Sequence, residues 1–276
     1  MNRDVDRLSR QELCDSRAAW WNDRFSALLW GHLESHDVGR VLDLGCGTGI
    51  LFQRMGHSFP PDTAIVGVDL DLARLRVAAG ESRDRREGGK ALYIVGDGKH
   101  LPFEDGSMDL SVSILVLQHV EHPQAIVAEL RRVTKNGGLC LCVEPDNAAQ
   151  RIHLPRHDPE FDAAVGDFWL RVRDSYLPRD VSIGPRLPGL LSESGLRVTD
   201  VDGYLIAQHV AEDAGGFEAR SSAFVRRIAA RYGLDGSGTV ERLLDLLAKR
   251  RVEYADCDAF YTIHVTPLFL VRAVKD

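Results

Sequence analysis

Residues 41–49 read Val-Leu-Asp-Leu-Gly-Cys-Gly-Thr-Gly, and this stretch decides the fold class of the chain. A short apolar run leads into three glycines at alternate positions, and an apolar segment of helical character begins at Ile50. The order predicts a strand, a tight turn and the start of a helix. Because glycine lets a backbone approach a ligand where a Cβ atom would clash, we expect the turn to face a nucleoside-like molecule.

The glycine spacing argues against a dinucleotide. A dinucleotide turn places its third glycine three positions after the second, whereas Gly49 follows Gly47 by two. Asp43 stands two residues before Gly45, where its carboxylate would repel a diphosphate and suit a cationic ligand.

Nearly all-apolar segments alternate with helical ones around this turn. We expect strands at 41–44, 64–69, 92–95, 110–115 and 139–143, and helices at 50–56, 72–79 and 123–134. This alternation predicts an α/β fold with a doubly wound, Rossmann-like sheet covered on both faces. We predict seven strands, mostly parallel, with residues 198–209 and 259–274 forming an antiparallel pair at the sheet edge.

Domain organisation follows from the same pattern. Residues 1–36 are expected to form an N-terminal helical segment, and residues 37–276 a single cofactor-binding domain. Two insertions, at about 146–185 and 210–258, carry no recognisable motif. We expect them to be helical, the second being two helices broken at 233–238, and to form a cap over the site.

Polar residues follow the second and third strands, at the sheet edge where ligands of such folds lie. Asp69, followed by Leu70, can accept hydrogen bonds from both hydroxyls of a ribose. Asp97 can accept from the amino group of an adenine, and Gly98 exposes a backbone N–H for a ring nitrogen.

These features occur in the order found in a known family. Residues 41–49, 66–69, 96–109 and 116–123 resemble the motifs of the class I S-adenosylmethionine-dependent methyltransferases, in particular the small-molecule subgroup that includes ubiquinone-biosynthesis-type enzymes. The resemblance covers about residues 38–145, with Thr134 and Asn136 in place of the usual leucine and proline. It implies S-adenosylmethionine as cofactor and S-adenosylhomocysteine as product.

The resemblance also implies roles for single residues. Asp43 would lie near the methionyl ammonium, Asp69 would hold the ribose, and Leu117 would lie near the methionine moiety. The remaining cofactor-binding residues implied are Gly45, Cys46, Gly47 and Gly49 under the methionine and ribose, and Leu70, Asp97 and Gly98 around the nucleoside.

Catalysis requires an aligned acceptor and, for a hydroxyl or acidic carbon, removal of its proton. His119 follows the fourth strand and is our first candidate for the base, the alternative being a loop histidine that fixes its turn. Glu144 ends the fifth strand and is our second catalytic candidate, as a group that binds the acceptor, or else a capping carboxylate. No His, Asp and Glu spacing indicates a metal site.

The composition of the chain limits the class of substrate. The net charge is −7 without a basic block, which disfavours nucleic acid. We expect a small-molecule acceptor, with O-methylation slightly ahead of N- or C-methylation and secondary metabolism as one fitting setting. An RNA or protein substrate, and cofactor binding without methyl transfer, stay open, as do a monomer and a homodimer. Cysteine usage and the absence of an apolar leader or span favour the cytoplasm.

Overall fold

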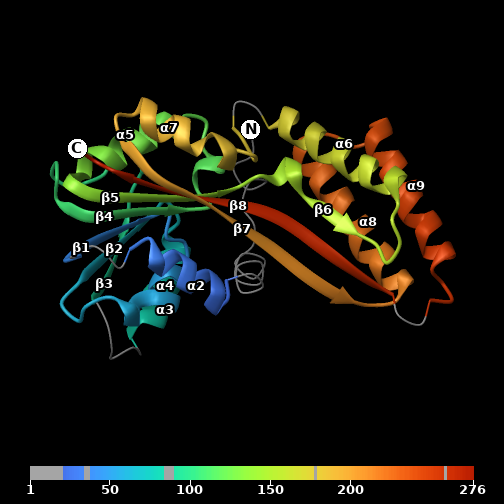
Figure 1. Ribbon diagram of the computed structural model, residues 1–276, viewed down its shortest axis with the longest axis horizontal. Coiled ribbons are helices and arrows are strands. Elements are labelled where there is room, and N and C mark those ends of the chain that lie inside the picture. Colours follow the sequence, from blue (N-terminus) through green and yellow to red (C-terminus); the bar gives the residue numbers. More distant parts are fainter. Residues whose placement is uncertain (1–20, 34–37, 84–89, 177–178, 258–259) are drawn as a thin grey trace. The chain divides into compact units, whose positions relative to one another are not determined.

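The computed structural model describes residues 21–33, 38–83, 90–176, 179–257 and 260–276 (Figure 1). The chain divides into two compact units. Of the described residues, the sheet unit contains those within Arg10–Pro145, Ile183–Tyr204 and Leu268–Asp276. The helical unit contains those within Asp146–Ser182 and Leu205–Pro267.

The strands follow the order β3-β2-β1-β4-β5-β8-β6, and β7 pairs with β8. Their bounds are β1 Arg40–Leu44, β2 Ala64–Asp69, β3 Lys90–Val95, β4 Met108–Ile114, β5 Thr134–Pro145, β6 Arg151–His153, β7 Arg197–Ala211 and β8 Tyr261–Val274. The pairs among β1 to β5 are parallel, and β8 runs antiparallel to β5 and β6. The predicted mostly parallel, doubly wound α/β fold is confirmed.

The sheet has eight strands among the described residues, so the predicted count of seven is wrong by one. The additional strand is β6, in a segment where only helices were expected. Its three residues are too few to display the alternation of side chains from which a strand is recognised.

Helices cover both faces of the sheet within the sheet unit (Figure 1). One face carries α2 (Asp23–Gly31), α3 (Ile50–Met55) and α4 (Leu72–Arg83), and the other carries α5 (Pro123–Val133) and α7 (Leu187–Glu193). Burial from both sides explains why residues 41–44 of β1 and 138–145 of β5 are continuously buried rather than buried at alternate positions. Of the predicted N-terminal helical segment, only residues 21–33 lie within the described part, and they contain α2.

The end of α5 differs from the prediction. The helix was expected to continue to Thr134 and stop at the glycines that follow, but it ends at Val133 and β5 begins directly. The residues between Thr134 and Leu139 bulge away from β4, and Gly137 adopts a φ of +74° there. The glycines therefore shape a bulge in the strand rather than the end of the helix.

The helical unit packs three long helices around one apolar core. They are α6 (Pro159–Ser175), α8 (Ala214–Tyr232) and α9 (Gly238–Glu253), and the core includes Phe161, Phe168 and Phe217. The predicted break at 233–238 is confirmed, with Gly233 ending α8 at a φ of +66° and Ser237 capping α9. That this unit caps the cofactor site stays a prediction.

Short 3-10 helices complete the fold: η1 (Gly56–Ser58), η2 (Leu117–His119), η3 (Asn147–Ala149) and η4 (Gly184–Arg186). Within the residues that the structure describes, no helix combines the length and apolarity needed to cross a bilayer.

Candidate functional site

The glycine turn joins β1 to α3, and its glycines are required by conformation and by space. Gly45, Gly47 and Gly49 have φ angles of +69°, +55° and +80°, which side chains disfavour. A Cβ atom on Gly45 would overlap Cγ2 of Val116, and one on Gly49 would lie 2.7 Å from the hydroxyl of Tyr93. Val116 and Tyr93 therefore pack against the turn, and no larger residue fits at Gly45 or Gly49.

Asp69 is attached to this turn by a direct hydrogen bond. Its Oδ2 accepts from the N–H of Gly47 at 2.9 Å, and its Oδ1 accepts from the N–H of Asp71 at 2.8 Å. The N–H of Gly45 donates to the carbonyl oxygen of Val68 at 2.7 Å, so the turn is fixed to the end of β2. A carboxylate offers about four acceptor positions. The two that remain on Asp69 suit the two hydroxyls of a ribose.

The residues after β2 and β3 present a mixed surface. Leu70, next to Asp69, is 64% exposed, which leaves an apolar side chain that a flat base could cover. Asp97 is exposed, and its Oδ1 accepts from the N–H of Lys99 at 3.0 Å. Gly98 is buried, and a Cβ atom there would lie 3.0 Å from the side chains of Leu44 and Ile126.

Asp43 and Cys46 are buried at the end of β1 and within the turn. Asp43 stands in register with Gly67 of β2 and Val112 of β4. Gly67 is required there, because a Cβ atom on it would lie 2.8 Å from Sγ of Cys46. The structure therefore places a buried carboxylate one residue before the last residue of β1, close in sequence to the turn.

The loop after β4 is strained and is held by Glu144. Leu115 has a φ of +58°, the one left-handed non-glycine conformation among the described residues. The N–H groups of Val116 and Leu117 donate to Oε1 of Glu144 at 2.7 and 2.6 Å, and that of Gln118 donates to Oε2 at 3.4 Å. A left-handed leucine costs about 1–2 kcal/mol, and charge-assisted hydrogen bonds of this kind are strong enough to offset it.

The two catalytic candidates have different surroundings. His119 ends η2 and is exposed, while Glu144 is fully buried and directs its oxygens at the backbone of residues 116–118. Leu117 is also fully buried, in the core that contains Ile126 and Val127. Of these three side chains, only that of His119 is exposed.

Three contributors to the site have no sequence signal. Tyr93 lies against Gly49 and Gly67, and its hydroxyl is 2.8 Å from Oγ of Ser82. Val116 occupies the space next to Gly45, and Leu115 adopts a conformation that leucine disfavours. The residue types alone do not predict these contacts or this dihedral angle.

Comparison with known proteins supports the assignment of the turn. Residues 42–142 match the protein family described as a methyltransferase domain. A demethylmenaquinone methyltransferase of Roseiflexus sp. strain RS-1 is 34% identical over 43% of this chain and 45% of its own length. A malonyl-[acyl-carrier protein] O-methyltransferase of Serratia marcescens is 35% identical over 49% of this chain and 53% of its own length. The chain thus spans about half the length of these curated relatives.

A solved structure extends the likeness of fold to most of the chain. The [4+2]-cyclase SpnF superposes with a TM-score of 0.52 at 18% identity, covering 93% of this chain and 86% of the cyclase. The matched family region contains the glycine turn, Asp69, Asp97 and the loop after β4. This match agrees with the methyltransferase resemblance from which S-adenosylmethionine was predicted as the cofactor. The match of residues 42–142 to a methyltransferase domain agrees with the predicted resemblance to the class I S-adenosylmethionine-dependent methyltransferases.

Proposed function

We propose that this chain transfers the methyl group of S-adenosylmethionine to a small-molecule acceptor and releases S-adenosylhomocysteine. The observation that carries the proposal is the link between the glycine turn and Asp69, in which the Gly47 N–H binds one carboxylate oxygen at 2.9 Å. This link holds a ribose acceptor beside a backbone that a ligand can approach closely.

The cofactor would lie along the carboxyl ends of β1, β2 and β3. In this pose the buried carboxylate of Asp43 faces the cationic methionyl group, and the backbone of Gly45, Cys46, Gly47 and Gly49 passes beneath the ligand. Asp69 accepts from the ribose hydroxyls. Leu70, Asp97 and Gly98 surround the adenine, and the loop containing Leu117 borders the methionine.

His119 is the proposed base and Glu144 the proposed positioning residue. Bound S-adenosylmethionine supplies an electrophilic methyl group on a sulfonium, a leaving group that needs no further activation. The exposed imidazole of His119 accepts the proton of an acceptor hydroxyl as the new bond to carbon forms, and then returns it to solvent. Glu144 acts through the backbone of residues 116–118, which it holds in the orientation that presents His119.

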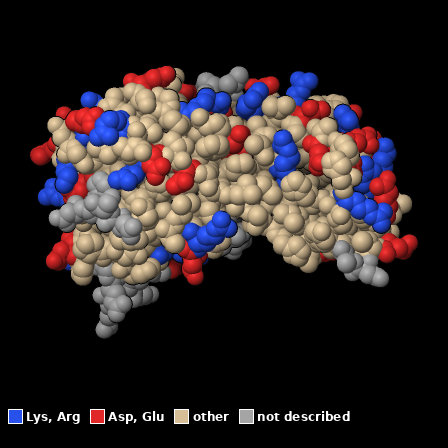
Figure 2. Space-filling model, viewed as in Figure 1, with Lys and Arg blue, Asp and Glu red and all other residues tan. Residues whose placement is uncertain are grey.

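Several observations favour a small-molecule acceptor. By their names, the relatives given above act on demethylmenaquinone and on malonyl-[acyl-carrier protein]. The net charge is −7, and on the face drawn in Figure 2 basic and acidic side chains are interspersed, without a continuous basic patch among the coloured residues. O-methylation is slightly favoured over N- or C-methylation, because a histidine base suits a hydroxyl.

Two alternatives have specific consequences. If the substrate is RNA or protein, a methyl group labelled in S-adenosylmethionine would appear in a macromolecule rather than in a small acceptor. Cofactor binding without methyl transfer is the second, since the cyclase shares this fold without being named a methyltransferase. Both retain the cofactor site and differ in what happens to the methyl group.

The test has two stages. Calorimetric titration with S-adenosylmethionine, S-adenosylhomocysteine and NAD should give micromolar binding of the two sulfur nucleosides and none of NAD. Release of S-adenosylhomocysteine is then followed with phenols, carboxylic acids, amines and activated carbon acids as acceptors. Binding of NAD alone would overturn the cofactor assignment. Tight binding of S-adenosylmethionine, with its labelled methyl group appearing only in RNA or protein, would overturn the small-molecule proposal. If the labelled methyl group appears in no acceptor, the alternative of cofactor binding without methyl transfer is favoured.

A further inference from the structure

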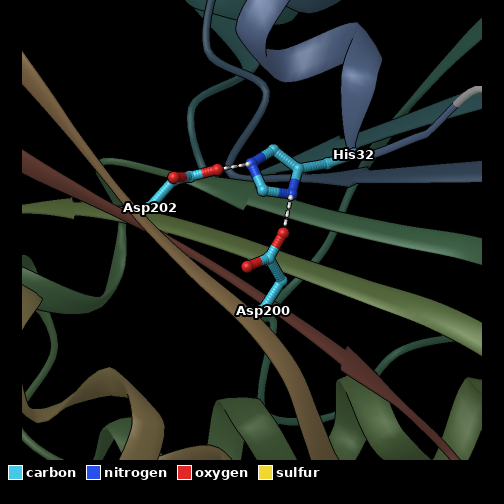
Figure 3. Close-up of side chains that lie close together, drawn as sticks. All are labelled: His32, Asp200 and Asp202. Atoms are coloured by element: carbon cyan, nitrogen blue, oxygen red, sulfur yellow. Dashed lines mark ion pairs between the residues drawn. The ribbon is translucent and has the colours of Figure 1, made fainter.

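The end of α2 brings a buried histidine between two aspartates of β7 (Figure 3). His32 has a side chain only 4% exposed, while those of Asp200 and Asp202 are 51% and 47% exposed. Because the aspartates are two residues apart on one strand, their side chains project from the same face of β7. The three residues belong to the sheet unit and are separated in sequence by more than half the chain.

The imidazole is poorly satisfied by these neighbours. Its Nε2 lies 3.1 Å from Oδ2 of Asp202, yet this buried nitrogen makes no hydrogen bond with any described residue. A nitrogen and an oxygen at that distance fail to bond only when the oxygen lies well off the N–H axis. A buried ring nitrogen left in this state is unfavourable, because it has lost its bond to water without gaining another.

The same off-axis position is what two ligands of one metal ion require. With nitrogen and oxygen each about 2.1 Å from an ion, a separation of 3.1 Å corresponds to an angle of about 95° at the ion. That angle lies between the octahedral and tetrahedral values. The ion would sit on the lone-pair axis of Nε2, with the Asp202 oxygen to its side.

Asp200 supplies a third ligand. One ligand atom from each of the three side chains lies within 4.8 Å of the other two, close enough for a single ion to bind all three after small rotations. Two carboxylates and a neutral imidazole carry a charge of −2, which matches a divalent cation. An imidazole ligand favours transition metals over Mg²⁺ and Ca²⁺.

We propose that His32, Asp200 and Asp202 bind a divalent transition-metal ion, Zn²⁺ being the best match, with water completing its coordination. The role of the ion is structural. The start of α2 already contacts the same face of β7, where the Tyr204 hydroxyl lies 3.2 Å from Oδ1 of Asn22. The ion fastens the other end of the helix to the same strand.

The rival explanation is a site without metal, in which a protonated His32 bridges the two carboxylates. Both explanations predict that removing a carboxylate weakens the attachment of α2. Only the metal site predicts that the stability of the wild-type protein responds to Zn²⁺ and that this response disappears in the aspartate variants.

The experiment uses full-length protein stripped with EDTA and dialysed. Titration with ZnCl₂ should give one site per chain with micromolar affinity, and Zn²⁺ should raise the Tm while Mg²⁺ at equal concentration should not. Asp200→Asn and Asp202→Asn should each weaken the affinity at least about tenfold. Because both side chains are about half exposed, these variants are expected to fold, which circular dichroism checks.

Asp235→Asn, an exposed aspartate between α8 and α9, is the matched control and should bind Zn²⁺ as the wild type does. Absence of saturable Zn²⁺ binding would overturn the proposal. So would equal affinity in the wild type and both aspartate variants, which would place any zinc elsewhere, for example on cysteine.

Discussion

Replacing Glu144 by alanine tests whether this residue positions the loop or acts on the acceptor. Its carboxylate accepts the N–H groups of Val116, Leu117 and Gln118, and it has no exposed surface. Glu144→Ala removes the acceptor of at least the two N–H groups with short bonds, at 2.7 Å in the part-buried setting of Val116 and 2.6 Å in the buried setting of Leu117. At about 1–3 kcal/mol for each unsatisfied group, the expected loss of unfolding free energy is about 2–6 kcal/mol.

Glu144→Gln separates the two roles. Glutamine keeps one oxygen for the two short bonds and presents its NH₂ group to the N–H of Gln118, which was the longest of the three contacts at 3.4 Å. We expect it to cost about 1–2 kcal/mol and to retain most of the activity, since the loop keeps its main support. If the carboxylate instead bound the acceptor or transferred a proton, the amide could not replace it, and Glu144→Gln would lose the activity entirely.

Urea unfolding followed by circular dichroism measures the stabilities, and calorimetry with S-adenosylmethionine measures the effect on the neighbouring turn. Glu193→Ala, an exposed glutamate at the end of α7, is the control and should stay within about 0.5 kcal/mol of the wild type. The positioning role is refuted if Glu144→Ala is no more destabilising than this control. It is equally refuted if Glu144→Gln abolishes turnover while its stability remains near that of the wild type.

Three further predictions follow from the site and from the helical unit. Asp69→Ala should weaken S-adenosylmethionine binding at least about tenfold in calorimetry, through loss of about two hydrogen bonds to the ribose, whereas exposed Asp62→Ala should bind normally; unchanged affinity in the first variant would exclude the ribose role. His119→Ala should lower the rate of S-adenosylhomocysteine release without changing cofactor affinity, and full activity would remove it as the base. Burial, with the Arg220 guanidinium, lowers the pKa of His264 to about 4 from 6.5. Since the unfolded chain then binds the proton first, stability is lost as the pH falls from about 6.5 to 4, by about 2 kcal/mol between pH 7 and pH 5. His264→Gln should remove that part of the pH dependence in urea unfolding, and an unaltered slope would show that the histidine is not shielded.

The sheet was predictable because its signals are local. Each central strand is a short apolar run, and each is bounded by glycine or acidic residues that can be recognised within a few positions. The same locality applies to the turn, where glycine at positions 45, 47 and 49 indicated a tight turn between a strand and a helix. The structure places that turn there and gives Gly45, Gly47 and Gly49 positive φ angles. The same local signals placed Asp69 at the carboxyl end of β2, where the structure has it, without knowledge of any contact.

Contacts between distant residues were not predictable in this way. Glu144 was expected at a strand end facing the ligand, but the side on which its side chain projects depends on the pleat of β5 and on the course of the loop after β4. His32 and the two aspartates of β7 likewise meet only because α2 packs on that strand. An argument from spacing along the chain finds metal ligands that are close in sequence and misses a set assembled by the fold.

The turn and the loop after β4 are packed directly against each other, and this is the property of the site most relevant to the proposed methyl transfer. Gly45 can have no side chain because Val116 occupies that space, and Val116 is held in place by Glu144 from the neighbouring strand. A shift of the loop would therefore open a gap under the turn, and a shift of the turn would collide with the loop. Transfer from a sulfonium requires the acceptor in line with the methyl group at about 3 Å. The glycine turn lies beneath the proposed cofactor position, and the loop after β4 carries His119. Because each segment holds the other in place, the two together can keep the methyl group and the acceptor aligned even if neither is rigid alone.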